Sequence, residues 1–341
     1  MFLWLRLHDK WTRFSHGSLQ IEHILTVSEL IHKNSGTAFS FEVLPPLKGT
    51  GTQALFNTID ALKEFEPEYI NITTHRSEYV YVEQTNGTYI RHFIRRRPGT
   101  VAVASAIMQK YGIKVVPHVV VSGMTKEDIE YMLLDLQFLG IQDILVLRGD
   151  KAKDEAKFLP LKDGYSHATE LIEQINQFNQ GRFVDGTSIK VPGKPFSYGV
   201  AAYPEKHEEA PNLEFDLQVL KQKQDLGADY AVTQIFYDNS KYFRFVELAR
   251  QAGITIPLIP GIKPMGKRSQ FNVLPKTFHL DLPEELSQAM SRCKSDEEVK
   301  QLGIEWGIQQ CRELMQHGVP SIHFYSMGVA DSIRAIAKEI Y

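Results

Sequence analysis

The chain has 341 residues, 43% of them hydrophobic and 23% charged, which is typical of a soluble globular protein with a large core. Its 38 basic and 41 acidic residues give a net charge of −3, which argues against nucleic acid or an anionic membrane as a partner. Two cysteines, Cys293 and Cys311, stand without metal-ligand spacing, so we expect a reduced cytoplasmic protein with no metal site.

The first predicted segment, residues 1–20, is apolar and basic but is interrupted by charge too early for a signal peptide. We interpret it as an N-terminal tail, either disordered or packed on the domain through its Trp and Leu side chains. A helix over 21–32 is then the first ordered element, and we expect residues 21–341 to form a single domain. No later window approaches the roughly 18 apolar residues that a membrane span requires.

Short apolar runs alternate with longer amphipathic segments along the rest of the chain. Eight of these runs predict strands, at 38–43, 69–73, 114–121, 143–148, 196–202, 230–236, 256–261 and 321–325. Helices are predicted over 52–65, 100–111, 125–139, 166–179, 212–226, 239–252, 267–279 and 328–340, with further helices across 283–316. This order predicts an α/β protein, a (β/α)8 TIM barrel with an extra N-terminal helix and hairpin insertions.

Two predicted hairpins interrupt the alternation. Residues 79–94 contain an Asn-Gly turn between two alternating stretches and follow the second strand, on the face where catalytic residues of barrels lie. We interpret this hairpin as a lid over the site or as a contact with a neighbouring subunit. The basic run 91–97 could add positive charge to the site or form a solvated loop. The second hairpin, over 182–191, is expected on the opposite face with a structural role.

Polar or conformationally special residues stand at the ends of nearly all eight strands. They are Glu42, Thr73, His118, Arg148 with Gly149 and Asp150, Tyr203 with Glu205 and His207, Gln234, Pro260 with Gly261, and Tyr325. One polar strand end alone is best explained as an ordinary loop residue. The strand ends of a barrel converge on one pocket, however, so the whole set predicts an active site.

Glu42 is the most informative residue of this set because it lies inside the apolar strand Phe39-Ser-Phe-Glu-Val. A buried, unpaired carboxyl keeps its proton to a higher pH than usual. Such a group can act as a general acid near neutral pH. The alternative is a glutamate that forms a salt bridge with an Arg or Lys of the barrel.

Seven motifs follow one another at these strand ends. They are Phe39-Ser-Phe-Glu-x-x-Pro-Pro46, Pro117-His118, Leu147-Arg-Gly-Asp150, Ala202-Tyr-Pro-Glu-x-His207, Thr233-Gln-x-Phe-Tyr-Asp238, Ile259-Pro-Gly-Ile262 and His323-Phe-Tyr325. Over residues 25–341 the chain resembles methylenetetrahydrofolate reductase in its short bacterial form, which consists of the catalytic barrel alone. The resemblance therefore implies a barrel without the adenosylmethionine-binding regulatory domain of longer forms.

The resemblance implies FAD-dependent reduction of 5,10-methylenetetrahydrofolate to 5-methyltetrahydrofolate, which supplies one-carbon units for methionine synthesis. NADH or NADPH would be the electron donor, and we expect a cytoplasmic homo-oligomer. No GxGxxG turn follows a predicted strand, but the barrel reductases hold FAD through side chains at the strand ends instead.

Residue roles transfer only where the motifs match. Glu42 corresponds to the general acid that protonates the folate, and Asp150 to the catalytic carboxylate beside the flavin and the pterin. Gln234 and Gln270 correspond to substrate-binding amides, and Asp150 also contacts substrate. The positions similar to flavin-binding residues are Thr73, His118, Arg148, Gly149, Asp150, His167, Ala168, Tyr203, His207, Asp216 and Lys223.

The chain departs from the family pattern at four positions. Val219 and Gln222 replace an Asn and an Arg on the expected flavin-binding helix, and Gly328 and Val329 stand where a substrate-contacting Arg is expected. The pyrophosphate and the glutamate tail must then be held differently. The alternatives are another flavin- or folate-linked barrel enzyme, such as a methyltransferase or a proline-dehydrogenase-like oxidase, and a folate- or flavin-binding protein without turnover.

Overall fold

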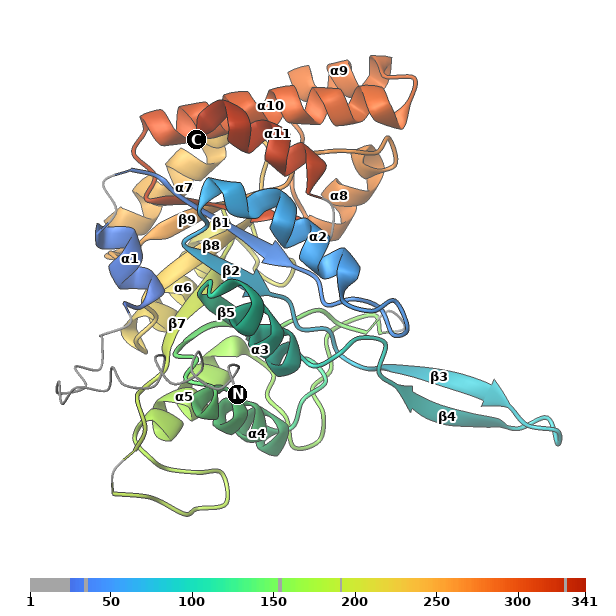
Figure 1. Cartoon of the computed structure of the whole chain (residues 1–341), viewed down its shortest axis with the longest axis vertical. Coiled ribbons are helices and arrows are strands. Elements are labelled where there is room, and N and C mark those ends of the chain that lie inside the picture. The colour runs from blue at the N-terminus through green and yellow to red at the C-terminus, as the bar shows by residue number, and fades with distance from the viewer. Residues whose placement is uncertain (1–24, 34–35, 153–154, 191, 328–329) are drawn as a thin grey trace, which may run out of the picture.

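The computed structural model describes residues 25–33, 36–152, 155–190, 192–327 and 330–341, without the side chains at positions 79 and 93. Eight parallel strands close into a barrel in the order β1-β10-β9-β8-β7-β6-β5-β2 (Figure 1). They are β1 (Ala38–Val43), β2 (Tyr69–Ile72), β5 (Val115–Val120), β6 (Asp143–Leu147), β7 (Ser197–Ala202), β8 (Tyr230–Ile235), β9 (Leu258–Ile262) and β10 (Ser321–Tyr325). The predicted barrel is confirmed, with all eight strands where the apolar runs placed them.

The helices also lie close to their predicted positions. They are α1 (Val27–Lys33), α2 (Gln53–Leu62) with the 3₁₀ turn η1 (Lys63–Phe65), α3 (Thr100–Tyr111), α4 (Lys126–Phe138), α5 (Ala168–Asn179), α6 (Leu213–Asp225), α7 (Asn239–Gln251), α8 (Gln270–Phe278), α9 (Glu284–Arg292), α10 (Asp296–Gln316) and α11 (Asp331–Ile340). Side-chain caps fix several starts, since Thr125, Asn212 and Ser295 each accept a hydrogen bond from the backbone N–H three residues later. No helix among the described residues is long and apolar enough to cross a bilayer.

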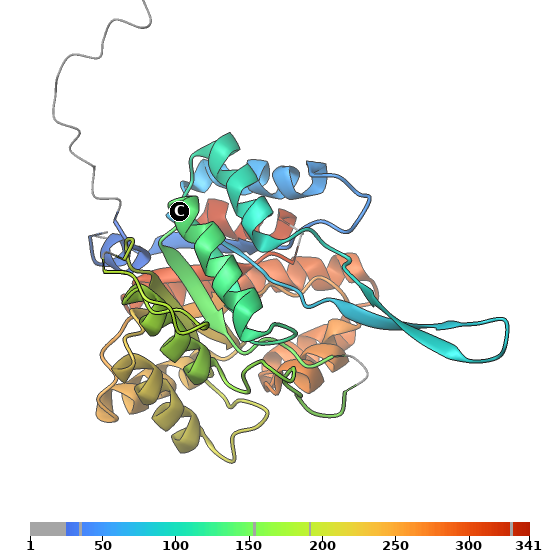
Figure 2. The same cartoon turned by 90° about the horizontal axis from the view of Figure 1, so that it is seen from below.

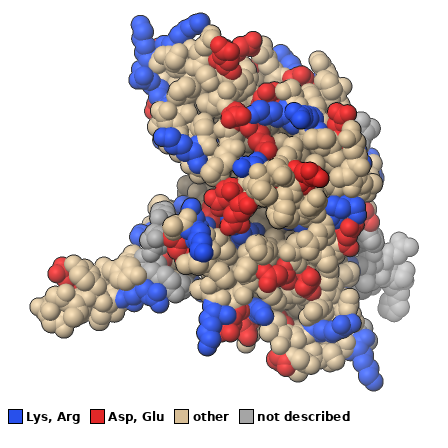
Figure 3. Space-filling model, turned by 180° about the vertical axis from the view of Figure 1, so that it is seen from behind, with Lys and Arg blue, Asp and Glu red and all other residues tan. Residues whose placement is uncertain are grey.

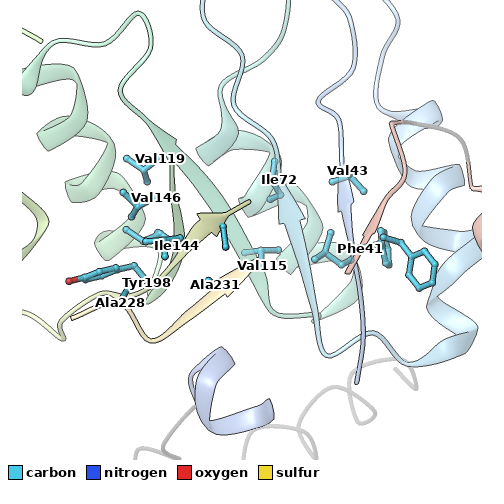
Figure 4. Close-up of a cluster of buried hydrophobic side chains, with 14 of the residues drawn as sticks. Phe41, Val43, Ile72, Val115, Val119, Ile144, Val146, Tyr198, Ala228 and Ala231 are labelled. Atoms are coloured by element: carbon cyan, nitrogen blue, oxygen red, sulfur yellow. The ribbon is translucent and has the colours of Figure 1, made fainter. Parts of the chain in front are cut away.

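The strands are buried on both faces, and each face contributes side chains to a different hydrophobic core. The outer core lies between the strands and the surrounding helices, and Figure 4 shows Phe41, Val43, Ile144 and Val146 among its members. The inner core fills the barrel with side chains from the intervening strand positions. Because side chains alternate along a strand, a residue of the outer core is followed by one that faces the inside of the barrel, and the reverse.

Helix α1 closes the end of the barrel where the strands begin (Figure 1). Val27 and Ile31 pack on the inner core. The backbone N–H of Val27 donates to Asp143 Oδ1 at 2.7 Å, and Lys114 Nζ lies 2.5 Å from Asp143 Oδ2. The barrel can thus open to solvent at its other end, where the strands finish. The predicted helix over 21–32 begins at Val27, and residues 1–20, interpreted as a tail, lie outside the described residues.

The first predicted hairpin is confirmed as β3 (Glu78–Glu83) and β4 (Tyr89–Ile94), an antiparallel pair that we call the arm. Figures 1 and 2 both show it projecting away from the barrel body, so in this arrangement it does not cover the strand ends as the lid interpretation required. Tyr81, Val82, Tyr89 and Ile90 are all exposed on it. On the side of the arm that Figure 3 shows, much of the surface towards the tip is neither acidic nor basic.

The second prediction, a hairpin of two strands over 182–191, is wrong, because the described residues of this range form a turn and no strand pair. One isolated antiparallel bridge joins Arg182 and Ser188, and the turn between them is held by Asp185 Oδ1, which accepts from the Thr187 N–H at 2.8 Å. The two flanking segments are too short to extend this bridge into a ladder, and residue 191 lies outside the described part.

Candidate active site

Glu42 lies at the end of β1 and is 5% exposed. Its partners in register are Asn71 on β2 and Tyr325 on β10. Burial raises the pKa of Glu42 from 4.5 to about 8, while the positive charge of nearby Lys263 acts in the opposite direction. No ion pair within 4 Å involves Glu42 in the described part of the chain, so the salt-bridged alternative is not observed. This carboxyl is protonated at neutral pH, as a general acid must be.

The ends of β5 and β6 place His118 and Asp150 at the same opening. Burial lowers the pKa of His118 to about 3, so its imidazole is neutral, and its Nε2 has no hydrogen-bond partner among the described residues. Gly149 adopts a φ of +80°, and a Cβ there would lie 2.9 Å from the Cβ of Ser122. Ser122 Oγ in turn donates to the Asp150 carbonyl at 2.5 Å. Only glycine fits this turn, which leaves the Asp150 side chain exposed.

The loop after β7 meets helix α6 at the rim of the barrel. The rings of Tyr203 and His207 lie edge to face with centroids 4.7 Å apart, and the His207 N–H donates to Asp216 at 2.7 Å. Lys223 is buried and donates to the carbonyl of Ala201 at 3.0 Å. Burial lowers the pKa of Lys223 to about 8 and that of His207 to about 4. These predicted residues therefore do come together around one end of the barrel.

Arg148 links this rim to the end of β6. Its guanidinium forms an ion pair with Glu208 at 2.8 Å, contacts Glu209, and lies 4.9 Å from the ring centre of Phe158. The Nε atom is buried and has no hydrogen-bond partner among the described residues. Arg148 is thus a positive group at the rim whose present partners are two exposed carboxylates.

Other predicted residues make few contacts with the rest of the site. The Thr73 hydroxyl donates to the carbonyl of Val43 on β1 at 3.4 Å and lies 3.2 Å from His75 Nε2. The amide oxygen of Gln234 accepts from the next backbone N–H at 2.8 Å, and that of Gln270 accepts from Gly266 at 2.7 Å. Their amide nitrogens remain as donors. His167 is exposed directly before α5, which begins at Ala168, and in the described part no hydrogen bond or ion pair joins either residue to the other site residues.

Sequence reasoning missed two charged or titratable residues at the opening, Lys263 and His75, and included Arg97 only as part of the basic run. Lys263 follows β9 directly, and its position one residue after the Ile259-Pro-Gly-Ile262 motif was the available signal. His75 lies between the charges of Arg97 and Asp150, and burial lowers its pKa. Arg97, at the base of the arm, donates to the carbonyl of Pro45 after β1. The predicted basic run thus contributes at least one residue to the rim. Gly328 and Val329 lie outside the described residues.

A separate groove lies on the outside of the barrel between α6 and α7, with a volume of about 960 Å³. It is lined by residues such as Leu217, Lys221 and Arg244, and by none of the strand-end residues. Because perturbed titratable groups gather at the strand ends and not in this groove, we place the active site at the barrel opening.

Comparisons with known proteins show the family of the chain. The family model for methylenetetrahydrofolate reductase matches residues 27–341. Methylenetetrahydrofolate reductase (NADH) 1 from Arabidopsis thaliana is 31% identical over 305 residues, covering 89% of this chain and 48% of that protein. The chain therefore spans about half the length of this plant relative. 5,10-Methylenetetrahydrofolate reductase from Salmonella typhimurium is 28% identical, covering 88% of this chain and 90% of that protein.

A solved structure shares the fold. It is an uncharacterized protein from Clostridium thermocellum that binds two copies of 5-methyl-5,6,7,8-tetrahydrofolic acid. Its TM-score is 0.52 at 14% identity, over 91% of this chain and 97% of that one. The match of the family model over nearly the whole described chain decides the relationship: the chain belongs to the methylenetetrahydrofolate reductase family.

Proposed function

We propose that the chain reduces 5,10-methylenetetrahydrofolate to 5-methyltetrahydrofolate, with FAD as bound cofactor and NADH or NADPH as electron donor. The observation that carries the proposal is the buried, protonated carboxyl of Glu42 at the barrel opening. Family membership over residues 27–341 supports the same reaction. The product would supply one-carbon units for methionine synthesis.

The donor set at the ends of β5, β6 and β7 fits FAD. His118 Nε2 and Arg148 Nε are buried nitrogens without partners in the described part, and a cofactor rich in acceptors would satisfy them. Arg148 and Lys223 would offer positive charge to the pyrophosphate, once the guanidinium exchanges its carboxylate partners for phosphate oxygens. The full proposed set is Thr73, His118, Arg148, Gly149, Asp150, His167, Ala168, Tyr203, His207, Asp216 and Lys223.

Bound FAD would carry two electrons from the reduced nicotinamide to the folate. The residues of the chain do the remaining work. Glu42 donates its proton to the bridging nitrogen of the folate, which opens the five-membered ring. The exposed carboxylate of Asp150 favours the positive charge that then develops on the substrate. The amide groups of Gln234 and Gln270 pair with polar edges of the pterin.

Glu42→Gln tests the proposal because it separates two half-reactions. We expect flavin reduction by NADH to stay within about twofold of the wild-type rate, and reoxidation by methylenetetrahydrofolate to fall at least about a hundredfold. Stopped-flow absorbance measures both rates. Glu247→Gln, which changes an exposed glutamate on α7, is the matched control. Equal slowing of both half-reactions in Glu42→Gln would make Glu42 a structural residue and not the acid.

We also propose that residues 21–341 act as one catalytic domain of a cytoplasmic homo-oligomer. The exposed apolar residues Tyr81, Val82, Tyr89 and Ile90 support self-association, because an isolated two-stranded ribbon gains little stability in water by itself.

A further inference from the structure

Three adjacent strands bring Glu42, Tyr325 and Lys263 to one level of the barrel. Phe41 on β1 pairs with Phe324 on β10, and Phe324 pairs with Ile262 on β9. Glu42, Tyr325 and Lys263 are the residues that directly follow these three paired residues. Glu42 and Tyr325 are themselves partners in register.

The same pairing shows which way the three side chains face. Phe41, Phe324 and Ile262 all belong to the outer core, between the strands and the helices. Because side chains alternate along a strand, the next residue on each strand faces the inside of the barrel. Glu42, Tyr325 and Lys263 therefore share the inner layer nearest the opening.

The aromatic ring of Tyr325 extends from β10 across β9 towards β8. Its hydroxyl donates to the carbonyl of Thr233 on β8 at 2.7 Å. A Cβ on Gly261 would lie 2.4 Å from the ring, so the ring crosses β9 two residues before Lys263. That crossing is one inner layer below Lys263, so the ring lies below the layer that Glu42 and Lys263 share, and the charge of each of these two groups acts on the other.

Lys263 is held at this place by its backbone and has no charged neighbour other than Glu42 among the residues that the structure describes. Its carbonyl accepts from the Tyr237 hydroxyl at 2.9 Å. In the described part of the chain its side chain forms no hydrogen bond or ion pair, and Glu42 is the one charge that acts on it. Glu42 likewise has Lys263 as its charged neighbour, with Asn71 and Tyr325 as the partners on the flanking strands. Among the described residues, Lys263 therefore has no structural partner for its partly buried ammonium.

We infer that Lys263 is a positioning residue for the reaction, whose ammonium stabilises the Glu42 carboxylate left behind when the proton moves to the folate. This inference rests on the proposed role of Glu42. The step breaks the O–H bond of Glu42 and forms an N–H bond on the bridging nitrogen of the folate. Without Lys263, burial alone would make Glu42 a weaker acid, since an anion would have to form in an apolar place.

The experiment titrates the Glu42 carboxyl directly, in protein that carries neither cofactor nor folate. Uniform labelling with δ-¹³C-glutamate gives one carbon resonance for each Glu side chain, and the resonance missing from Glu42→Gln identifies Glu42. We expect Lys263→Met to raise the pKa of Glu42 by at least about one unit, and Lys263→Arg to keep it within about half a unit. Lys276→Met, which removes an exposed ammonium from α8, should leave it unchanged.

A kinetic readout follows the same variants in the complete reaction. Lys263→Met should move the alkaline limb of the folate-driven reoxidation rate to higher pH and lower that rate about threefold or more, with reduction by NADH unaffected. Lys263→Arg should restore both properties. If Lys263→Met does not fold, Lys263→Gln carries the same test.

The outcomes separate this inference from the proposed function. A Glu42 titration that does not move in Lys263→Met or Lys263→Gln overturns the inference, whatever the wild-type protein does with folate. A titration that moves as expected, in a protein that never reduces methylenetetrahydrofolate, supports the coupling of the two groups and overturns the proposed function instead.

Discussion

Replacing Glu42 by Gln should change how the stability of the protein depends on pH. The native pKa of Glu42 is raised from 4.5 to about 8, so between these values the folded protein holds a proton that the unfolded chain has released. Stability from this group is therefore fully present below pH 4.5 and is lost as the pH rises through about 8. At about 1.4 kcal/mol for each pH unit, the loss is at most about 5 kcal/mol.

Glu42→Gln removes this loss because the amide does not ionise. Urea denaturation followed by circular dichroism at pH 5, 7 and 9 gives the free energy of unfolding of both proteins. Between pH 5 and 9 we expect the free energy of unfolding of the wild type to fall by about 4 kcal/mol relative to that of the variant. Glu247→Gln, at an exposed position, should follow the wild-type curve. Parallel curves for wild type and Glu42→Gln would refute a buried carboxyl with a raised pKa.

Four further changes have defined outcomes. Gly261→Ala should lower the free energy of unfolding by about 3 kcal/mol in thermal melts, because its Cβ would lie 2.3 Å from the carbonyl of Thr233. Asp143→Asn should lower it by about 3 kcal/mol in urea, since it leaves the Lys114 ammonium without its carboxylate. Lys223→Met should weaken FAD binding at least about tenfold in fluorescence titrations, and unchanged affinity would remove this residue from the cofactor site. Replacing 80–93 with a Gly-Ser turn should lower the mass found by sedimentation equilibrium; an unchanged mass would show that the arm is not the subunit contact.

The barrel could be predicted from sequence because its strands are short apolar runs separated by longer amphipathic helices. Runs such as Ala38–Val43 and Val115–Val120 are buried at every position, which is why they lack the alternation of a half-exposed strand. The hairpin over 182–191 was overestimated for a related reason. A turn signal such as Asp185-Gly186 specifies the turn but not whether the flanking residues find a ladder.

A residue of the candidate site could be predicted from sequence where its side chain is unusual for its place in a strand. Glu42 stood out because a carboxylate is costly in an apolar strand, and the structure gives it the raised pKa that this argument requires. Lys263 was missed because its importance comes from β10, which sets β1 and β9 at the same level although they are far apart in sequence. The orientation of the arm was missed for a similar reason, since an alternating pattern defines two faces but not what they meet.

The absorption spectrum of the purified protein, reconstituted with FAD, tests the central claim most directly. We predict flavin bands in the protein fraction that bleach when NADH or NADPH is added without oxygen. They should return on addition of methylenetetrahydrofolate, with formation of 5-methyltetrahydrofolate. A protein that takes up no FAD, or whose reduced flavin is not reoxidised by methylenetetrahydrofolate, would contradict the proposed function.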